Sequence, residues 1–213
     1  MNPSVDVILT AVVLLNFVVL GTTRIHIAIR ASAAQGLVLS LLPVLSGHGE
    51  GWRMVSLALG AAALKGVLIP WLLLKALRDV AIRREVEPYV SFVTSLVLCA
   101  VGTAAALLFA GRLPLAPEHQ GTLIVPTALA TLWAGFLGVS TRRKAVTQVV
   151  GYLVLENGIF VFGQLLIGAM PFLVEAGALL DLLAAVFVMG IVVNHIQREF
   201  SSVDIASLSR LKE

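Results

Sequence analysis

A carboxylate lies in the middle of an apolar stretch of this chain, GYLVLENGIFVFG (151–163). Glu156 and its neighbour Asn157 are flanked on both sides by apolar side chains, so the stretch is suited to lipid. An ionisable group at such a depth is costly, and it is typical of ion pathways and proton relays. The chemistry that this pattern predicts for Glu156 is proton exchange inside a membrane.

Further ionisable residues lie within apolar runs. Lys65 is central in MVSLALGAAALKGVLIPWLLLKA, and Asp181 lies near the middle of FLVEAGALLDLLAAVFVMGIVVNHI, with Glu175 nearer to its start. At a rise of about 1.5 Å per residue, Lys65 and Glu156 are each about 16 Å from the start of their runs, and Asp181 is about 14 Å in. Charges of opposite sign thus share roughly one depth on separate predicted helices.

Two interpretations of these charges remain open. A titratable relay would use Glu156 and Asp181 as exchangeable proton sites, with Lys65 tuning their proton affinity or carrying charge itself. A structural ion network would use the same charges only to lock helices together. Glu175 is six residues from Asp181, about 240° around a helix, so the two cannot share a face. Glu175 is therefore either an entry residue or an interface contact.

Polar and small residues on the predicted helix of Glu156 favour a site that faces protein. Gln148, Tyr152, Glu156 and Gly163 fall on one face by helical spacing. We expect this face to meet protein or water rather than lipid, with Asn157 beside it.

The run around Lys65 has the features of a cavity wall. Gly60 and Gly66 permit the close approach of another helix. Pro70 has no N–H group, so in a regular α-helix the carbonyl of Gly66, beside Lys65, lacks its donor. In a membrane such a carbonyl usually lines a cavity or is satisfied by side chains or water.

The composition places these runs in an integral membrane protein. Of the 213 residues, 59% are hydrophobic and 13% are charged, and the mean hydropathy is +0.99. Soluble domains carry about 25% charged residues. The single cysteine, Cys99, allows no disulfide within the chain, and the sequence has no CxxC pair, Cys/His cluster or nucleotide-binding glycine motif. We therefore expect no cofactor, metal or catalytic centre in this chain.

Seven runs are long enough to cross a bilayer, which takes about 20 apolar residues. The first lacks a basic start and a small-residue cleavage pattern, so it is expected to be a retained helix rather than a signal peptide. The second is the weakest, because Arg30 intrudes and the apolar part that follows is short, which predicts a tilted or broken helix. The predicted spans are 5–23, 27–46, 54–76, 89–111, 121–141, 145–170 and 172–196.

The distribution of basic residues predicts the orientation of these spans. Loops on alternate sides of the membrane would carry twelve Lys and Arg residues on one side and two on the other. Because basic residues in short loops stay in the cytoplasm, the C-terminus is expected there and the N-terminus outside. The side with two holds Arg53 and Arg112, and the side with twelve holds Arg24, Arg30, Lys75, Arg78, Arg83, Arg84, Arg142, Arg143, Lys144, Arg198, Arg210 and Lys212.

The sequence divides into two membrane parts and a tail. Residues 1–111 carry four predicted spans, residues 121–196 carry three, and residues 197–213 form a cytoplasmic tail. The longest cytoplasmic connection, at 75–88, is either a solvated charged loop or a docking surface for a peripheral subunit. We find no internal repeat and no separate soluble domain in the sequence.

Several of these segments together resemble hydrogenase-4 membrane component E, a family of group 4 energy-converting nickel–iron hydrogenases of the formate hydrogenlyase type. The resemblance rests on RRKAVTQVVGYLVLENGIF, on the FLVEAGALLD run with the tail that follows it, on ALKGVLIPWLL and on TTRIHIAIRASAAQGLVL. It covers most of the chain and is strongest over 142–213. This C-terminal part also resembles the K-type subunit of respiratory complex I and the C subunit of Mrp antiporters, which are three-helix proteins with acidic residues in their second and third helices.

The resemblance implies roles for individual residues. Glu156 matches the first family carboxylate, in the GY…ENG motif. Asp181 lies on or near the second, where the complex I relatives have glutamate at slightly different spacing. Lys65 lies in the part that is peculiar to the hydrogenase family, which has a lysine followed by a proline there. Lys144 departs from the family pattern, in which an asparagine is expected after the arginines.

Together, the residues and the resemblance predict an all-helical, seven-span, non-catalytic subunit of an energy-converting hydrogenase or a closely related complex. The resemblance implies the cytoplasmic (inner) membrane of a bacterium or archaeon, and lateral conduction of protons, or of sodium ions, through Glu156, Asp181 and Lys65. The implied partners are antiporter-like and quinone-module-like membrane subunits and a peripheral hydrogenase arm, within the lipid bilayer; no nucleic acid is expected. Two alternatives stay open: a scaffold whose buried charges only hold helices together, and a free-standing small transporter, which the lack of an internal repeat disfavours.

Overall fold

The computed structural model describes residues 3–46, 51–79, 89–114, 121–165 and 190. Within these residues the chain is helical and has no strand, and six stretches are long and apolar enough to cross a membrane. The prediction of an all-helical, multi-pass membrane protein is confirmed. The seventh predicted span, apart from residue 190, and the predicted tail lie outside the described residues.

The membrane-crossing stretches of the described residues correspond to the first six predicted spans. The second predicted span contains two helices, and the third contains two α-helices joined by a π-helical turn. The elements are α1 (Pro3–Gly21), α2 (Ile25–Ser40), α3 (Leu42–Ser46), α4 (Gly51–Ala61), η1 (Ala62–Leu68), α5 (Ile69–Asp79), α6 (Phe92–Ala110), α7 (Ile124–Thr141) and α8 (Ala145–Gly163).

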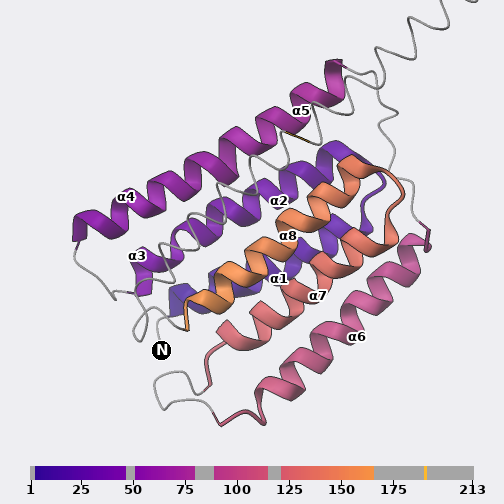
Figure 1. Ribbon diagram of the computed structural model, residues 1–213. Helices are drawn as coiled ribbons and strands as arrows, with labels where there is room; N and C mark the ends of the chain where they lie inside the picture. Colours follow the sequence, from indigo (N-terminus) through magenta and orange to yellow (C-terminus); the bar gives the residue numbers. More distant parts are fainter. Residues whose placement is uncertain (1–2, 47–50, 80–88, 115–120, 166–189, 191–213) are drawn as a thin grey trace, which may run out of the picture.

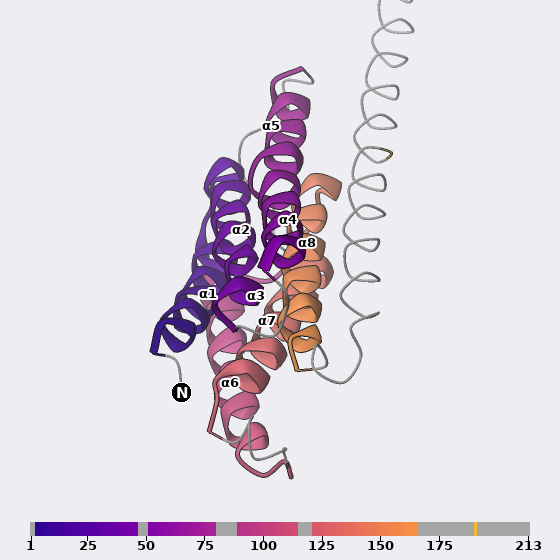
Figure 2. The same ribbon diagram turned by 90° about the vertical axis from the view of Figure 1, so that its left-hand side faces the viewer.

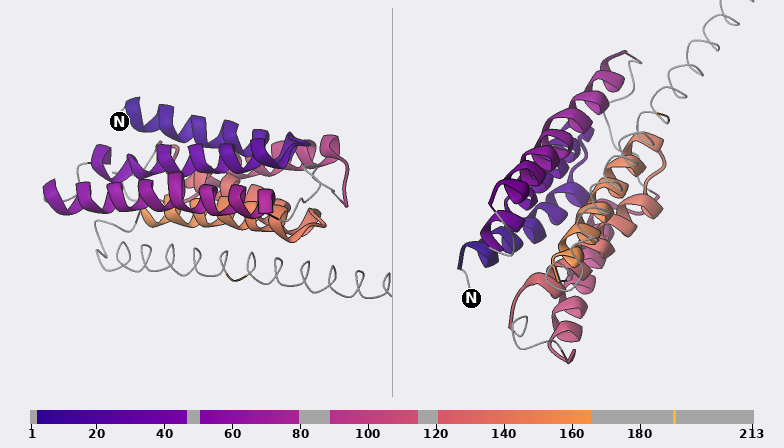
Figure 3. Two further views of the ribbon diagram at one scale, coloured as in Figure 1. Left: turned by 90° about the horizontal axis from the view of Figure 1, so that it is seen from above. Right: turned by 60° about the vertical axis from the view of Figure 1, so that its left-hand side comes forward.

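The described helices form a bundle of two layers (Figure 1, Figure 2). One layer contains α1, α2 and the continuous helix α4–η1–α5, and the other contains α6, α7 and α8, as the right-hand view of Figure 3 shows. Contacts of α1 with α6 and α7, and of α2 with α8, join the layers. Helix α6, which the sequence places with the first membrane part, therefore packs along α7 of the second.

The second span is broken, as its sequence predicts. Helix α2 ends at Ser40, and the chain continues through a turn at Leu41 into the short helix α3. Pro43 has no N–H group for the carbonyl of Leu39, so the α-helical ladder cannot continue through this point. The hydroxyl of Ser40 donates to the carbonyl of Leu37 at 2.7 Å at the end of α2.

The third span is one continuous helix with a π-helical turn, η1, in its middle; α4 and α5 follow one line in Figure 1. The N–H of Ile69 donates to the carbonyl of Leu64, five residues earlier, where an α-helix would use Lys65. In this register the matching donor for the Lys65 carbonyl would belong to Pro70, which has no N–H group. In the π-helical register, the backbone donor that Pro70 cannot supply is therefore the one for the carbonyl of Lys65. In a regular α-helix, as predicted, it would be the one for the carbonyl of Gly66.

Helices α7 and α8 pack backbone against backbone through glycines. A Cβ atom on Gly151 would lie 2.5 Å from the backbone of Gly138, and one on Gly158 would lie 2.7 Å from the backbone nitrogen of Leu132. Small residues give membrane helices this close approach, which increases their van der Waals contact. The packing holds α8, and with it Glu156, in a fixed register against α7.

The outward faces of the bundle are apolar. Exposed side chains include Val97, Val101 and Leu108 on α6, and Val67 and Trp71 on the third span. Lipid tails are as apolar as these side chains, so a bilayer can cover them. This surface agrees with a chain that crosses a membrane several times.

Basic residues gather at one end of the bundle. Arg24 lies between α1 and α2, Lys75 and Arg78 lie in the last turns of α5, and Arg142 and Arg143 lie between α7 and α8. Because consecutive spans run in opposite directions, these connections lie at the same end, opposite to the N-terminus in Figure 1. The arrangement is the one that the predicted topology requires. The orientation of the termini relative to the membrane stays a prediction.

Candidate functional site

Lys65 and Glu156 form an ion pair inside the bundle. Lys65 Nζ lies 3.3 Å from Glu156 Oε1, and the two side chains are 7% and 3% exposed. Lys65 belongs to η1 in one layer and Glu156 to α8 in the other, so the pair bridges the layers. At the basic end of the bundle the span of Lys65 ends at Lys75, and that of Glu156 begins at Val146. Each of the two residues is therefore ten residues from that end of its span. This separation is about 15 Å, which is half of a hydrocarbon core of about 30 Å.

Two further side chains of α8 surround the Lys65 ammonium. Nζ donates to Asn157 Oδ1 at 3.4 Å and lies 5.0 Å from the centre of the Phe160 ring. The face of an aromatic ring attracts a cation, most strongly where water is excluded. The ammonium therefore faces a carboxylate and an amide oxygen from one turn of α8 and an aromatic ring from the next turn.

A small cavity adjoins the ion pair. Its volume is about 10 Å³, which is at the lower limit for one water molecule. Charged and polar side chains in its wall suit a water better than an apolar group. The lining residues are Ser32, Lys65, Ile69, Leu153, Glu156 and Asn157.

A chain of buried amide side chains leads from the ion pair across the bundle. Asn157 Nδ2 donates to Gln35 Oε1 at 3.2 Å, and Gln35 Nε2 donates to Asn16 Oδ1 at 2.8 Å. Asn16 Nδ2 donates in turn to Thr131 Oγ1 at 3.0 Å. These side chains are all buried. We call this set the amide chain; it connects α8, α2, α1 and α7 in that order.

The backbone fixes the direction of the amide chain. Gln35 Nε2 also donates to the carbonyl of Val12 at 3.2 Å, and a carbonyl can only accept. The nitrogen of the Gln35 amide therefore faces Val12, which leaves its oxygen for Asn157. Asn157 then turns its own oxygen towards Lys65. The negative ends of the aligned amide dipoles face the ammonium, and the bonds of such a chain strengthen one another.

The sequence interpretation missed Gln35, Asn16 and Thr131, because none of them is ionisable. The signal that could have found them is a lone amide in a long apolar helix, as in PSVDVILTAVVLLNFVVLG for Asn16 and IHIAIRASAAQGLVLS for Gln35. Polar side chains in membrane helices tend to hydrogen-bond across helices. The residue types alone do not show which side chain each amide would hydrogen-bond.

The other residues predicted to support Glu156 lie at different places along α8. Gln148 Nε2 donates to the carbonyl of Arg142 at 2.9 Å, so it holds the turn before the helix rather than the ion pair. Tyr152 is half-buried, and Gly163 is half-buried in the last turn of the helix. Asn157, by contrast, contacts Lys65 directly.

Close packing of α2 positions Lys65 on the third span. A Cβ atom on Gly36 would lie 2.7 Å from Lys65 Cβ, so the backbone of α2 comes directly against the lysine stem. Pro70 is buried just after η1, and it helps to position Lys65 because it favours the register of the π-helical turn. Such turns are rare and occur frequently at functional sites.

Two predicted site residues, Asp181 and Glu175, lie outside the described residues. Within the part of the chain that the structure describes, His, Cys, Asp and Glu side chains do not come together in groups of three or more that could hold a metal ion. Of the predicted site residues, the structure thus brings Lys65, Glu156 and Asn157 together, and Asn157 connects them to the amide chain.

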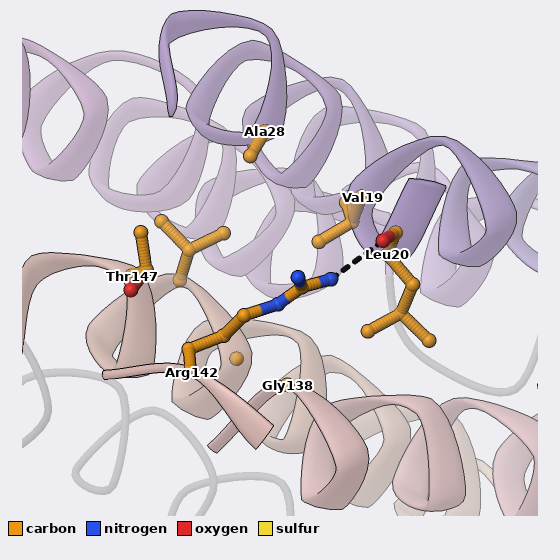
Figure 4. Close-up of a pocket in the computed structure, with 8 residues that line it drawn as sticks. Val19, Leu20, Ala28, Gly138, Arg142 and Thr147 are labelled. Carbon is orange, nitrogen blue, oxygen red and sulfur yellow. Dashed lines mark hydrogen bonds between the residues drawn. The ribbon is translucent and has the colours of Figure 1, made fainter. Parts of the chain in front are cut away.

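A further buried charge, Arg142, lies in the connection between α7 and α8, and Figure 4 shows its side chain reaching towards Leu20 of α1. Its Nη2 donates to the carbonyl of Leu20 at 2.5 Å, close to the C-terminus of α1, and its guanidinium lies 5.0 Å from the centre of the Phe92 ring. Burial lowers the pKa of the Arg142 guanidinium, because desolvation disfavours its charged form. These contacts tie the α7–α8 connection to α1 and α6.

Known proteins match this chain to different extents. The uncharacterized protein Rv0085 of Mycobacterium tuberculosis (strain ATCC 25618 / H37Rv) is 32% identical over 213 residues, which are 98% of this chain and 96% of the relative. Hydrogenase-4 component E of Escherichia coli (strain K12) is 34% identical over 101 residues, 47% of this chain and 46% of the relative. The Shigella flexneri protein of the same name matches to the same extent. No family model and no solved structure matches the chain.

The similarity to hydrogenase-4 component E confirms the predicted relationship in part, because it covers about half of this chain rather than most of it. The predicted similarity to the K-type subunit of complex I and the C subunit of Mrp antiporters stays a prediction. The match to Rv0085, in contrast, spans almost all of both chains. This chain therefore belongs to the protein family of Rv0085.

Proposed function

We propose that this chain is a non-catalytic membrane subunit of a hydrogenase-type complex and that it helps to conduct protons, or sodium ions, laterally at mid-membrane. Glu156 is the exchanging group in the described part of the path, and Lys65 is its charged partner. Asp181, on the predicted seventh span, is the next exchange site, and Glu175 is its entry or interface residue. The similarity to hydrogenase-4 component E supports membership in the complex.

The buried Lys65–Glu156 pair is the observation that carries the proposal. Replacing a buried ion pair by apolar residues of similar size is often neutral or stabilising, because both charges lose their water when they are buried. Stability alone is therefore a weak reason for a pair at the centre of a bilayer. Ionisable residues that pair inside a membrane typically mark ion pathways and proton relays.

The depth of the polar groups supports lateral movement. Gln35 lies ten residues from Ile25, and Thr131 lies ten residues from Thr141, where their spans meet the basic end of the bundle. These separations equal those of the ion pair. At about 1.5 Å per residue these groups share one level, about 15 Å into the membrane. Asn16, which links Gln35 to Thr131, is five residues from the end of its span at Gly21 and so starts from a level nearer the basic end. The other polar groups extend across the bundle in the membrane plane, as a lateral path requires.

The contacts of the ion pair indicate how a proton would change it. A proton that binds to Glu156 neutralises the carboxylate and removes its attraction for Lys65. The ammonium keeps Asn157 Oδ1 and the Phe160 ring as partners, so it stays at the site. When the proton leaves, the carboxylate again attracts the ammonium. Each passage changes the charge at mid-membrane by one unit, and neighbouring sites sense this change strongly because the interior has a low dielectric constant.

Two other functions compete with this proposal. In a scaffold, the same pair would only hold η1 against α8, and its loss would disturb assembly. A free-standing small transporter would be stable and would conduct ions without partner subunits. Purification of the native complex with identification of its subunits separates the transporter from the other two possibilities.

The substitution Glu156→Gln tests the relay directly. Glutamine keeps the size of the side chain and its hydrogen bonding but cannot exchange a proton. We expect the complex to assemble at normal levels and to keep its activity with soluble electron donors, while proton uptake into inverted membrane vesicles during turnover falls sharply. Normal proton uptake in this variant would exclude Glu156 as a relay site.

A second variant separates the relay from the scaffold. In a scaffold, Glu156→Gln leaves the Lys65 charge buried without its carboxylate, which costs about 3–5 kcal/mol and impairs assembly. Adding Lys65→Met removes that charge, so a scaffold would recover both assembly and coupling. In the relay, the double variant assembles and still does not pump.

A further inference from the structure

We infer that the ion handled at this site is the proton and not sodium. The inference rests on the proposed function, since it names the ion that the Glu156 site exchanges. It follows from the position of the Lys65 ammonium, which occupies the place that an inorganic cation would need.

The surroundings of Lys65 Nζ are those of a bound cation. A carboxylate oxygen of Glu156 lies 3.3 Å away, the amide oxygen of Asn157 lies 3.4 Å away, and the centre of the Phe160 ring lies 5.0 Å away. Carboxylate and amide oxygens are the ligands that hard cations take in proteins, and an aromatic face attracts cations. The protein thus supplies its own cation to this site, tethered to the backbone of η1.

The amide chain holds the oxygen of Asn157 in this position. The carbonyl of Val12 orients Gln35, and Gln35 Oε1 accepts from the amide nitrogen of Asn157. Asn157 cannot turn its nitrogen towards Lys65 without breaking this chain. The site therefore remains arranged for a positive charge whatever the charge of Glu156.

Within the described residues, the site has little space for a second cation. The adjoining cavity has a volume of about 10 Å³, which is room for about one water. The backbone of α2 at Gly36 blocks the lysine stem from moving to that side. A sodium ion must exchange its hydration shell for protein oxygens, and the ammonium of Lys65 both fills their centre and repels it. A proton needs no such space, because it binds directly to the Glu156 carboxylate.

Two substitutions of Lys65 test the inference on the complex purified from native membranes. Lys65→Ala removes the ammonium and opens its space, whereas Lys65→Met removes the ammonium and keeps the space filled. The measurements are binding of radioactive sodium and the midpoint of thermal unfolding (Tm) in sodium chloride and in choline chloride. We expect the wild-type complex to bind no sodium above background and to have the same Tm in both salts within about 1 °C.

The two variants should differ from each other. Lys65→Ala should bind sodium saturably, and its Tm should rise by about 3 °C or more in sodium chloride well above the dissociation constant. Lys65→Met should show neither effect. Adding Glu156→Gln to Lys65→Ala removes the carboxylate and should abolish the gained binding.

Saturable sodium binding by the wild-type complex that is lost on Glu156→Gln overturns the inference, because that loss places the sodium at this site and not on a partner subunit. A Lys65→Ala complex that assembles but binds no sodium overturns it as well, since the ammonium would then not occupy a cation position. If Lys65→Ala does not assemble, the wild-type complex and its Glu156→Gln variant decide the question. Sodium binding that depends on Glu156 then contradicts the inference, and the absence of such binding supports it.

Failure of the proposed function gives a different result. Normal proton uptake in Glu156→Gln would show that the site is outside the path. The sodium measurements would be unchanged by that outcome, because they report on the occupancy of the site and not on transport.

Discussion

The amide chain allows a sharp test of the packing around the ion pair, through the substitution Gln35→Leu. Gln35 is fully buried and makes three hydrogen bonds, donating to Val12 and Asn16 and accepting from Asn157. Leucine has a similar volume and no polar group. The substitution therefore removes the centre of the chain while it keeps the space between α1, α2 and α8 filled.

The expected loss of stability follows from these contacts. At about 0.6 kcal/mol for each hydrogen bond between membrane helices, the three bonds together contribute about 2 kcal/mol. Asn157 and Asn16 each also keep a buried polar atom that has lost its partner, and such a group costs about 1–3 kcal/mol. The lost bonds alone give about 2 kcal/mol and the two groups without partners give about 2–6 kcal/mol, so we expect Gln35→Leu to lower the free energy of unfolding by about 2–6 kcal/mol.

The measurement is unfolding of the purified protein in mixed micelles with increasing mole fraction of a denaturing detergent. Ile27→Ala, on the exposed side of the same helix, is the matched control and should stay within about 0.5 kcal/mol of the wild type. Combining Gln35→Leu with Asn157→Leu should cost less than the sum of the two single changes, because Asn157 has already lost its partner. A Gln35→Leu protein as stable as the control, or strictly additive effects, would refute the connected amide chain.

Three further predictions concern other parts of the bundle. Gly151→Ala places a methyl group on the α7 backbone and should destabilise the protein by about 1–3 kcal/mol, whereas Gly60→Ala, whose Cβ would meet none of the described residues, should be neutral in the same unfolding assay. Arg142→Met removes the bond to Leu20 and should lower the unfolding free energy by about 1.5–3 kcal/mol, while Arg143→Met on the exposed neighbour should change it by less than about 0.5 kcal/mol. A reporter fused to the last residue should be active in the cytoplasm; external activity would contradict the seven-span topology.

The described spans could be predicted because the bilayer thickness sets the length of a membrane helix, and apolar composition marks where such a helix lies in the sequence. A run of about 20 apolar residues has to cross the bilayer as a helix whatever its neighbours are. The break in the second span could be predicted in kind but not in place, because Arg30 lies inside the unbroken helix α2 and the chain turns only at Leu41. The π-helical turn at 62–68 could not be predicted, because its sequence, AALKGVL, is compatible with a regular α-helix and its register depends on what packs against it.

The rotation of each helix was less predictable than its existence. The sequence of α6 is apolar on all sides, so hydrophobic periodicity does not identify its inward face. Lys65 and Glu156 could be placed at one depth by counting residues, but not at one angle, and only the bundle brings them to 3.3 Å. Gln35 and Asn16 escaped prediction for a different reason, since an amide carries no charge to mark the position as costly.

The position of Lys65 in its helix explains how the fold can hold a charge at mid-membrane. The buried residues Lys65, Ile69, Leu73 and Leu77 follow one another at intervals of four, so the lysine takes the first place in a row that faces the interior of the bundle. Lipid would offer an ammonium at this depth no partner, whereas the interior offers a carboxylate, an amide oxygen and a ring. The cost of burying the charge is thus offset by contacts that depend on the rotation of two helices against each other. Any shift of α8 by one residue would turn Glu156 away by about 100°, which is why the tight glycine packing of α7 on α8 matters for the charge site as much as for stability.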